Sequence, residues 1–153
     1  MTDIDFRIAR EEDLSEIVRL LAEDELGARR EELTDPPSQK YIDAFAAMTV
    51  QADNNYIVAV LAGDIVGCYQ LTIIHGLSRG GASRAQIESV RVEGKLRGQG
   101  VGKQMFQDAI ERAQNSGCSL VQLTTDNSRT DAHRFYEDLG FAATHVGYKL
   151  QLT

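Results

Sequence analysis

The chain has 153 residues and a formal net charge of −7 at pH 7, and this length suits one domain with a sizeable hydrophobic core. We therefore expect a single domain over residues 1–153, whose acidic balance argues against a nucleic-acid-binding surface. The same balance would suit a cationic substrate.

Several further classes of protein are disfavoured by the sequence. The longest apolar run, residues 57–62, is far too short to span a bilayer, and the first residues carry no signal-peptide pattern. Two cysteines, Cys68 and Cys118, make no disulfide framework, so we expect reduced and buried thiols. The histidines and cysteines share no metal-ligand spacing, so we expect no metal site. These observations favour a cytoplasmic protein that binds neither membrane nor nucleic acid.

The first fifty residues predict a strand and two helices. A short strand at 6–8 is followed by an amphipathic helix, whose apolar face is made of Leu14, Ile17, Val18 and Leu21. Residues 23–38 are strongly charged and contain Pro36-Pro37, so we expect a loop or a helix end there. A second apolar stripe then predicts a helix that packs on the core, and its members are Tyr41, Ile42, Phe45 and Met48.

The middle of the chain predicts a β-hairpin. Residues 56–61 and 65–74 have the composition of strands, and Ala62-Gly63-Asp64 between them is typical of a tight turn. A loop rich in glycine and serine is expected at 75–84. The hairpin therefore supplies two neighbouring strands of a sheet.

The next strand, residues 85–92, changes phase along its length. Ile87 falls on one face of the strand, whereas Val90 and Val92 fall on the other. A one-residue slip moves every later side chain to the opposite face, and we therefore expect a β-bulge inside this strand.

The last third of the chain predicts two more helices and two more strands. A long helix has apolar residues at helical spacing and a terminating Gly117; the apolar residues are Val101, Met105, Ala109, Ile110 and Ala113. A strand at 120–125, a helix at 132–139 and a closing strand region from Phe141 to Leu152 follow. The resulting order is β-α-α-β-β-β-α-β-α-β. It predicts an α/β (α+β) fold with a mixed, mostly antiparallel central sheet flanked by helices.

A glycine-rich turn connects residues 85–92 to the long helix. Such a turn leads several unpaired N–H groups and the positive end of the helix dipole to one place, which is a geometry that binds phosphate. Basic residues gather around it, namely Arg91, Lys95, Arg97 and Lys103. The spacing excludes a P-loop, because Arg97 and Gln104 occupy two of its required positions. It also excludes the dinucleotide fingerprint, because Lys103 stands where that motif has glycine.

Two motifs together indicate a family. Residues 97–102 read RGQGVG, which resembles the Q/R-x-x-G-x-G/A pyrophosphate loop of the GNAT acetyltransferases. Residues 132–141 read AHRFYEDLGF, which is similar to the A-x-x-F/L-Y-x-x-x-G-F element near the end of those enzymes. Because both motifs occur at the expected separation and the element order also agrees, the chain is identified as a single GNAT (GCN5-related N-acetyltransferase) domain.

The resemblance implies residue roles. Main-chain N–H groups of the loop would hold acetyl-CoA, and the loop comprises Arg97, Gly98, Gln99, Gly100, Val101, Gly102 and Lys103. A main-chain N–H near Val90, Arg91 or Val92 would polarise the thioester carbonyl. Many relatives have asparagine seven residues before the tyrosine, but here that position is Arg129. Either Asn127 serves from a longer loop or Arg129 contacts the cofactor instead.

Two side chains are candidates for the chemistry. Glu88 lies on the strand before the cofactor loop and would accept the proton of the amine, directly or through water; the alternative is a surface glutamate in an ion pair. Tyr136 would protonate the leaving thiolate, and the alternative is a packed aromatic whose hydroxyl only touches the sulfur.

The acceptor pocket has weaker candidates, each of which has packing as its alternative. They are Tyr41, Tyr69, His75, His145 and Tyr148. An acidic run could attract a cationic amine or form a solvated face, and it consists of Glu23, Asp24, Glu25, Glu31 and Glu32.

We therefore expect acetyl transfer from acetyl-CoA to a primary amine of a small molecule or peptide, by a protein that could form a homodimer. The alternatives are transfer of another acyl group, a hydroxyl acceptor, a non-catalytic acyl-CoA sensor and a purely structural domain.

Overall fold

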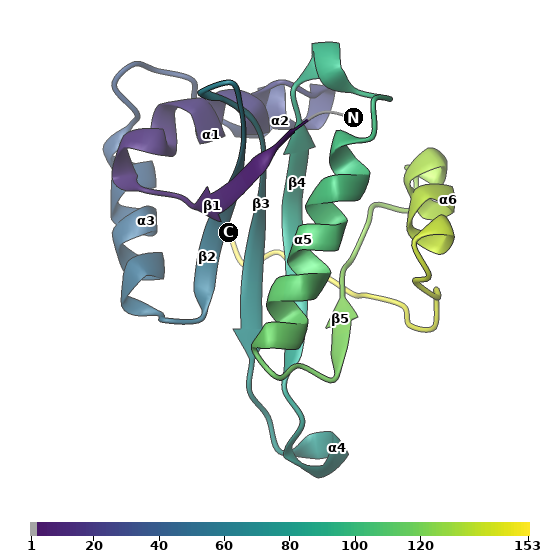
Figure 1. Ribbon diagram of the computed structural model, residues 1–153. Coiled ribbons are helices and arrows are strands. Elements are labelled where there is room, and N and C mark those ends of the chain that lie inside the picture. Colours follow the sequence, from purple (N-terminus) through teal and green to yellow (C-terminus); the bar gives the residue numbers. More distant parts are fainter. Residues whose placement is uncertain (1–2) are drawn as a thin grey trace. The chain divides into compact units, whose positions relative to one another are not determined.

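Five strands form one sheet in the computed structural model of the protein, which describes residues 3–153. Contacts divide the chain into two units, one ending at Gln122 and the other comprising Leu123–Thr153, and each is described by itself. The sheet belongs to the first unit, and its spatial order is the chain order β1-β2-β3-β4-β5 (Figure 1). The strands are β1 (Asp5–Ile8), β2 (Asn54–Leu61), β3 (Asp64–Ile74), β4 (Arg84–Val92) and β5 (Leu120–Gln122). The first four pair antiparallel and β5 runs parallel to β4, so the mixed, mostly antiparallel sheet is confirmed.

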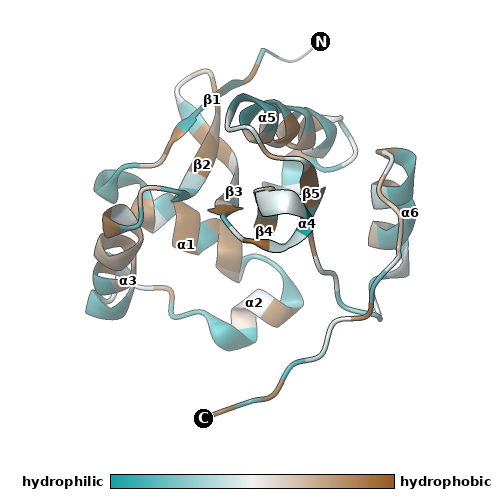
Figure 2. Ribbon diagram, turned by 90° about the horizontal axis from the view of Figure 1, so that it is seen from below, coloured by the Kyte–Doolittle hydropathy of each residue, from teal (hydrophilic) through white to brown (hydrophobic). Residues whose placement is uncertain are grey.

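Helices cover both faces of this sheet. Those of the first unit are η1 (Glu11–Asp13), α1 (Leu14–Ala22), α2 (Glu25–Arg30), α3 (Gln39–Val50), α4 (Ser78–Gly81), η2 (Gly94–Leu96) and α5 (Val101–Asn115). The end-on view places α1, α2 and α3 on one side of the strands and α5 on the other (Figure 2). None of the helices among the described residues has the length and apolar character needed to cross a membrane.

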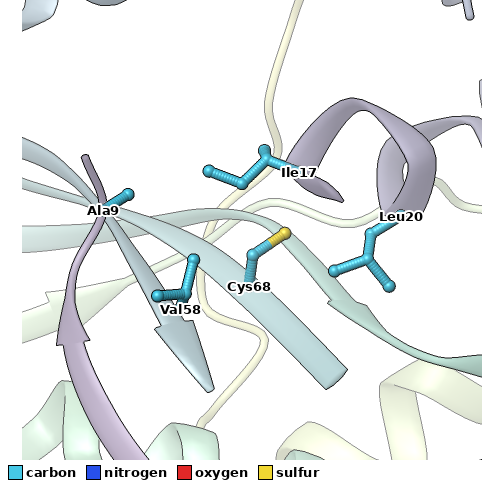
Figure 3. Close-up of a cluster of buried hydrophobic side chains, with 5 residues drawn as sticks. All are labelled: Ala9, Ile17, Leu20, Val58 and Cys68. Atoms are coloured by element: carbon cyan, nitrogen blue, oxygen red, sulfur yellow. The ribbon is translucent and has the colours of Figure 1, made fainter. Parts of the chain in front are cut away.

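One half of the core lies between α1 and the sheet. Figure 3 shows the side chains of this cluster pointing toward one another from α1, β2, β3 and the end of β1; they are Ala9, Ile17, Leu20, Val58 and Cys68. Cys68 is fully buried, and burial raises the pKa of its thiol to about 12. Both cysteines carry free thiols, but Cys118 is only half-buried.

The other half of the core lies under α5. Four of the five apolar residues predicted to face the core from this helix are buried, and they are Val101, Met105, Ala109 and Ala113. Ile110 is only half-buried, and Phe106 is buried in addition. Gly67 of β3 lets α5 approach closely, because an added Cβ would stand 3.0 Å from the Met105 sulfur. The Tyr69 hydroxyl donates to Asp108, which also accepts from Arg112 Nε at 2.7 Å. Arg112 Nη2 in turn donates to the Phe6 carbonyl at 3.2 Å, so this polar chain links α5 to β3 and β1.

The predicted bulge is present in β4. Cys68 pairs with Arg91 and Gln70 pairs with Glu88, so Ser89 and Val90 together lie opposite the single residue Tyr69. Ser89 has a φ of +52°, in the left-handed region. A bulge leaves its extra residue unpaired and interrupts the ladder, and here it does so beside the candidate catalytic strand positions.

Two segments predicted as loops contain short helices. Residues 23–38 include α2, which begins because the Asp24 carboxylate accepts from Gly27 N at 2.5 Å. Gly27 is required at this place, since a Cβ would stand 1.8 Å from the Leu21 carbonyl oxygen. The loop after β3 includes α4, whose Arg79 and Gly80 have left-handed backbone angles. The predicted hairpin turn is confirmed at Ala62 and Gly63, both with positive φ.

The second unit contains the predicted helix but not the predicted closing strand. Helix α6 spans Thr130–Asp138 and is followed by Gly140 with a φ of +96°. Residues 141–153 have no strand assignment. Phe141 is half-buried, but the later large apolar side chains are exposed, and they are Val146, Tyr148, Leu150 and Leu152. The strand prediction was wrong because alternation shows which face is apolar but does not supply a neighbouring strand to pair with.

Candidate active site

The glycine turn leads into α5 with the geometry expected of a phosphate-binding loop. Gly98 and Gly100 have φ values of +77° and +85°, which residues with a Cβ rarely adopt. A Cβ at either position would meet no atom within 4 Å, so the surface above both residues is open. The turn is thus shaped by backbone conformation and not by packing.

The amino terminus of α5 is uncapped. Gly100 occupies the position before the helix, and no side chain of residues 3–153 caps the first turn by a hydrogen bond. The first main-chain bond of the helix runs from Gln104 N to the Gly100 carbonyl at 3.2 Å. The N–H groups of Val101, Gly102 and Lys103 precede that bond and therefore have no partner within the helix, and they carry the positive end of its dipole.

The cations expected around this turn divide into two groups. Arg97, Lys95 and Lys103 are exposed, and Arg97 Nε donates to the Val92 carbonyl at 3.3 Å. Arg91 is different, because its side chain is only 13% exposed and turns to Asp24, with Nε 3.2 Å from the carboxylate. The guanidinium of Arg91 therefore lies on the α1 face of the sheet and is not directed at the glycine turn.

Glu88 stands at the bulge. It is exposed and accepts a hydrogen bond from Gln86 Nε2 at 2.8 Å. Its Cα partner across the ladder is Gln70 of β3, and its next neighbour is the strained Ser89. The Glu88 carboxylate makes no ion pair among the described residues, and its role as a base stays a prediction.

A cavity of about 350 Å³ opens on the same face of the sheet. Its apolar wall comes from α1 and α3, and its polar wall consists of Arg30, Glu31, Tyr41, Tyr56, Gln70, Ser89 and Arg91. Gln70 and Ser89 place this cavity directly beside Glu88. A molecule held in the cavity would therefore lie next to the candidate base.

Tyr56 is a half-buried tyrosine of this wall. Burial raises the pKa of its phenol to about 12, and a hydrogen bond with the Ser89 side chain and the charge of Arg91 oppose part of that shift. The phenol therefore stays protonated at neutral pH and acts as a polar contact. Four residues of this wall were not predicted from the sequence, namely Tyr56, Gln70, Ser89 and Arg30. The phase of β2 and β3 could have found the first two, because they share a face with buried Val58 and Cys68.

The structure places the weaker candidates for the acceptor pocket at different locations, and only one of them lines the cavity. Tyr41 lines the cavity and Tyr69 faces α5. His75 lies beyond β3, where its two ring nitrogens contact Ser83 Oγ at 2.8 Å and Asp53 Oδ2 at 2.9 Å. His145 and Tyr148 are exposed in the second unit.

The remaining predicted site residues belong to the second unit. Asn127 is exposed within a turn in which the Asp126 carboxylate accepts from Ser128 N and Oγ, and these bonds lower the pKa of that carboxyl. Arg129 is exposed at the start of α6. Tyr136 is half-buried, and its ring lies edge-on to Phe135 and Phe141, with centroids 5.7 and 6.2 Å away. The roles assigned to these three residues stay predictions.

Comparison with known proteins decides the family. The sequence model of the Acetyltransferase (GNAT) family matches residues 14–141. The chain belongs to the GNAT acetyltransferase family. A glucosamine 6-phosphate N-acetyltransferase from Trypanosoma brucei brucei is 30% identical over 99% of this chain and 98% of its own length. An aminoalkylphosphonate N-acetyltransferase from Salmonella typhimurium is 32% identical over 72% of this chain and 71% of its own.

A solved structure supports the same fold. A protein from Bacillus halodurans C-125, described as a transcriptional regulator, superposes with a TM-score of 0.94 at 45% identity, over 98% of this chain and 100% of that one. As a GNAT protein the chain is an acyltransferase of the N-acetyltransferase type, and members of this family take their acetyl group from acetyl-CoA.

Proposed function

We propose that the protein transfers an acetyl group from acetyl-CoA directly to the primary amine of a small molecule. The observation that carries this proposal is the uncapped start of α5, which follows directly after a bulged strand bearing Glu88. One stretch of chain thus combines an anion-binding helix terminus with a carboxylate beside a cavity.

Acetyl-CoA would be bound at the glycine turn. The main-chain amides from Arg97 to Lys103 would bind the pyrophosphate, because a helix amino terminus favours negative charge. The exposed cations Arg97 and Lys103 add long-range attraction. Asn127 and Arg129 remain two candidates for one further cofactor contact.

Direct transfer makes one C–N bond and breaks one C–S bond. The amine attacks the thioester carbonyl while a main-chain N–H near Val90–Val92 stabilises the developing oxyanion. Glu88 takes the proton that the amine loses, directly or through water. Tyr136 gives a proton to the leaving thiolate, which would otherwise depart as an anion.

The size of the cavity favours a small acceptor. A volume of about 350 Å³ lies at the lower end of the range for small-molecule sites. The two enzymes named above act on an amino sugar phosphate and on aminoalkylphosphonates according to their descriptions, which supports a small-molecule amine over a peptide. A single domain, a cytoplasmic location and a possible homodimer complete the proposal, and the free thiols of Cys68 and Cys118 fit a reducing compartment.

A second candidate function is a sensor that binds acyl-CoA without turnover. The description of the Bacillus halodurans relative as a transcriptional regulator favours it. The carboxylate of Glu88 beside a cavity favours the enzyme, because a sensor needs no base.

Thiol release separates the two. Purified protein is mixed with acetyl-CoA and a panel of amines, amino acids, amino sugars and peptides, and free CoA is measured with a thiol reagent. We expect release well above the amine-free rate for at least one small amine. Binding of acetyl-CoA by calorimetry without release for any acceptor would support the sensor and contradict the enzyme.

A further inference from the structure

Two arginines contribute to the wall of the acceptor cavity. Arg91 comes from β4, beside the bulge, and Arg30 is the last residue of α2. They reach the cavity from separate elements, on the face of the sheet where Glu88 stands. Two guanidinium groups would not favour a simple aliphatic ammonium ion in this cavity, because like charges repel.

Arg91 has binding capacity left. Its Nη1 donates to the Val90 carbonyl at 3.0 Å, and its Nε faces the Asp24 carboxylate at 3.2 Å without the geometry of a hydrogen bond. The Nε atom is buried and has no hydrogen-bond partner among the described residues. Nε is shielded from the cavity and faces Asp24, but Arg91 lines the cavity and its Nη2 makes no hydrogen bond within the described residues. A ligand oxygen could therefore accept from Nη2.

Arg30 is the less constrained of the two. It is exposed, its Nε makes a long bond of 3.3 Å to the Leu26 carbonyl, and it forms no ion pair within the described part of the chain. Its neighbour Arg29 points elsewhere and pairs with Glu25 at 3.1 Å. The two arginines are adjacent in sequence, yet only Arg30 lines the cavity.

The cavity wall also carries negative charge. Glu31 lines it, and Asp24 pairs with Arg91, while Tyr41 and Tyr56 add phenol groups to the wall. A ligand with one positive and one negative group would match this wall better than a simple amine or a simple anion, because each of its charges would meet an opposite one.

We propose that the acceptor carries an anionic group, such as a phosphate, phosphonate or carboxylate, in addition to its amine, and that Arg30 and Arg91 bind this group. The inference rests on the proposed function, since it assigns the cavity to the acceptor. Arginine suits this role because its planar fork matches the oxygens of such groups.

Matched acceptors test the charge preference. Glucosamine 6-phosphate is compared with glucosamine, and β-alanine with β-alaninamide, by thiol release at saturating acetyl-CoA. The first pair reports on phosphate and the second on carboxylate. We expect kcat/KM to be at least about 10-fold higher for the anionic member of one pair.

Variants test the assignment to these residues. Arg30→Gln and Arg91→Lys should each raise KM for the preferred anionic acceptor by about 10-fold to 100-fold with little change in kcat. Lysine is chosen at position 91 because it keeps the ion pair with Asp24. Arg29→Gln is the matched control and should leave KM unchanged.

The outcomes are distinct. A best acceptor without an anionic group, or unchanged KM values in both folded variants, overturns the inference and leaves the proposed function intact. If Arg91→Lys fails to fold, the exposed Arg30 variant alone decides. An absence of turnover with every acceptor contradicts the proposed function itself.

Discussion

The bulge of β4 determines the backbone conformation and side-chain direction of three nearby residues, Glu88, Ser89 and Arg91. Ser89 takes the left-handed φ of +52°, a conformation that is uncommon for a residue with a side chain and is often found at functional sites. The extra residue keeps both Glu88 and Arg91 on the cavity face, opposite Gln70 and Cys68 respectively. In a regular strand these two residues, three apart, would point to opposite faces.

Replacing the carboxylate should alter the pH dependence of turnover. If Glu88 accepts the amine proton, Glu88→Gln should lower kcat/KM most at low pH, by about 10²-fold or more. At high pH the free amine is already neutral, so activity should partly recover. The measurement is a pH–rate profile of both proteins, with Glu111→Gln as an exposed control on α5. Superimposable profiles for Glu88→Gln and the parent protein would remove Glu88 from the proton transfer.

Tyr136 can be tested without changing the shape of its ring. Tyr136→Phe keeps the edge-on contacts with Phe135 and Phe141 and removes only the hydroxyl. We expect a loss of kcat of about 10²-fold, with nearly unchanged acetyl-CoA affinity and melting temperature. Glu137→Gln, at an exposed position of the same helix, is the control and should be fully active. Full activity of Tyr136→Phe would make this tyrosine a packing residue.

At the scale of single elements, the entry into α5 can be compared with another turn of the same backbone conformation. Gly100 and Gly63 have φ values of +85° and +89°, and neither has an atom within 4 Å of an added Cβ. Gly100→Ala and Gly63→Ala should therefore lose similar stability, about 1 kcal/mol each. Only Gly100→Ala should lose acetyl-CoA affinity, by about 10-fold or more, because its methyl group would stand where the pyrophosphate approaches.

Calorimetry with acetyl-CoA, beside a melting curve for each variant, measures this difference. Equal affinities in the two alanine variants would show that the coenzyme does not approach the backbone at Gly100.

The junction between β1 and α1 is held by Asp13, which is a buried carboxylate. It accepts from Arg7 Nη1 at 2.7 Å and from Arg10 N at 2.7 Å. The hydrogen bond from Arg7 lowers the pKa of Asp13 below its usual 3.8, although burial opposes the shift. Because the folded pKa is depressed, the stabilisation is complete above the unfolded pKa and is lost as the pH falls through the folded pKa.

Asp13→Asn should thus lower the free energy of unfolding at pH 7 by about 1–3 kcal/mol. The difference in the free energy of unfolding between the variant and the parent protein should become smaller below about pH 3.8. Thermal unfolding at several pH values measures this difference, and Glu12→Gln, whose side chain is 73% exposed, is the control. If the difference in stability stayed constant down to pH 2, the stability lost in Asp13→Asn would come from packing and not from charge.

Local sequence patterns predicted most elements but not their partners. The phase slip at Ile87 and Val90 located the bulge, and the glycines at 98 and 100 located the turn, because both signals lie within a few residues. The short helix α2 was missed because it depends on Gly27 fitting against the Leu21 carbonyl. The strand expected after Phe141 is absent for a different reason, because strand pairing depends on a neighbour that is distant in sequence. The cavity wall was only partly predicted, because Arg30, Tyr56 and Ser89 are brought together by the fold.

Over the whole molecule, net charge proved a poor guide to the cavity. The charge of −7 would suit a cationic substrate, yet the cavity wall carries two arginines and one glutamate. Acidic side chains at exposed positions, such as Glu25, Glu32 and Glu111, contribute to the total without facing the cavity. Long-range attraction and local recognition therefore have to be measured separately, the first by its salt dependence.

Coenzyme binding should stabilise the folded protein as a whole. A ligand that binds only the native state at 100 times its Kd adds about 2.7 kcal/mol, which for a chain of this length corresponds to an increase in Tm of about 5–10 °C. S-acetyl-N-acetylcysteamine carries the same thioester without the pyrophosphate and nucleotide, so at equal concentration it should shift Tm by less than about 2 °C. The measurement is thermal unfolding of the parent protein and of Gly100→Ala with each compound. Equal shifts for the two thioesters, or none for acetyl-CoA, would contradict a pyrophosphate site at the start of α5.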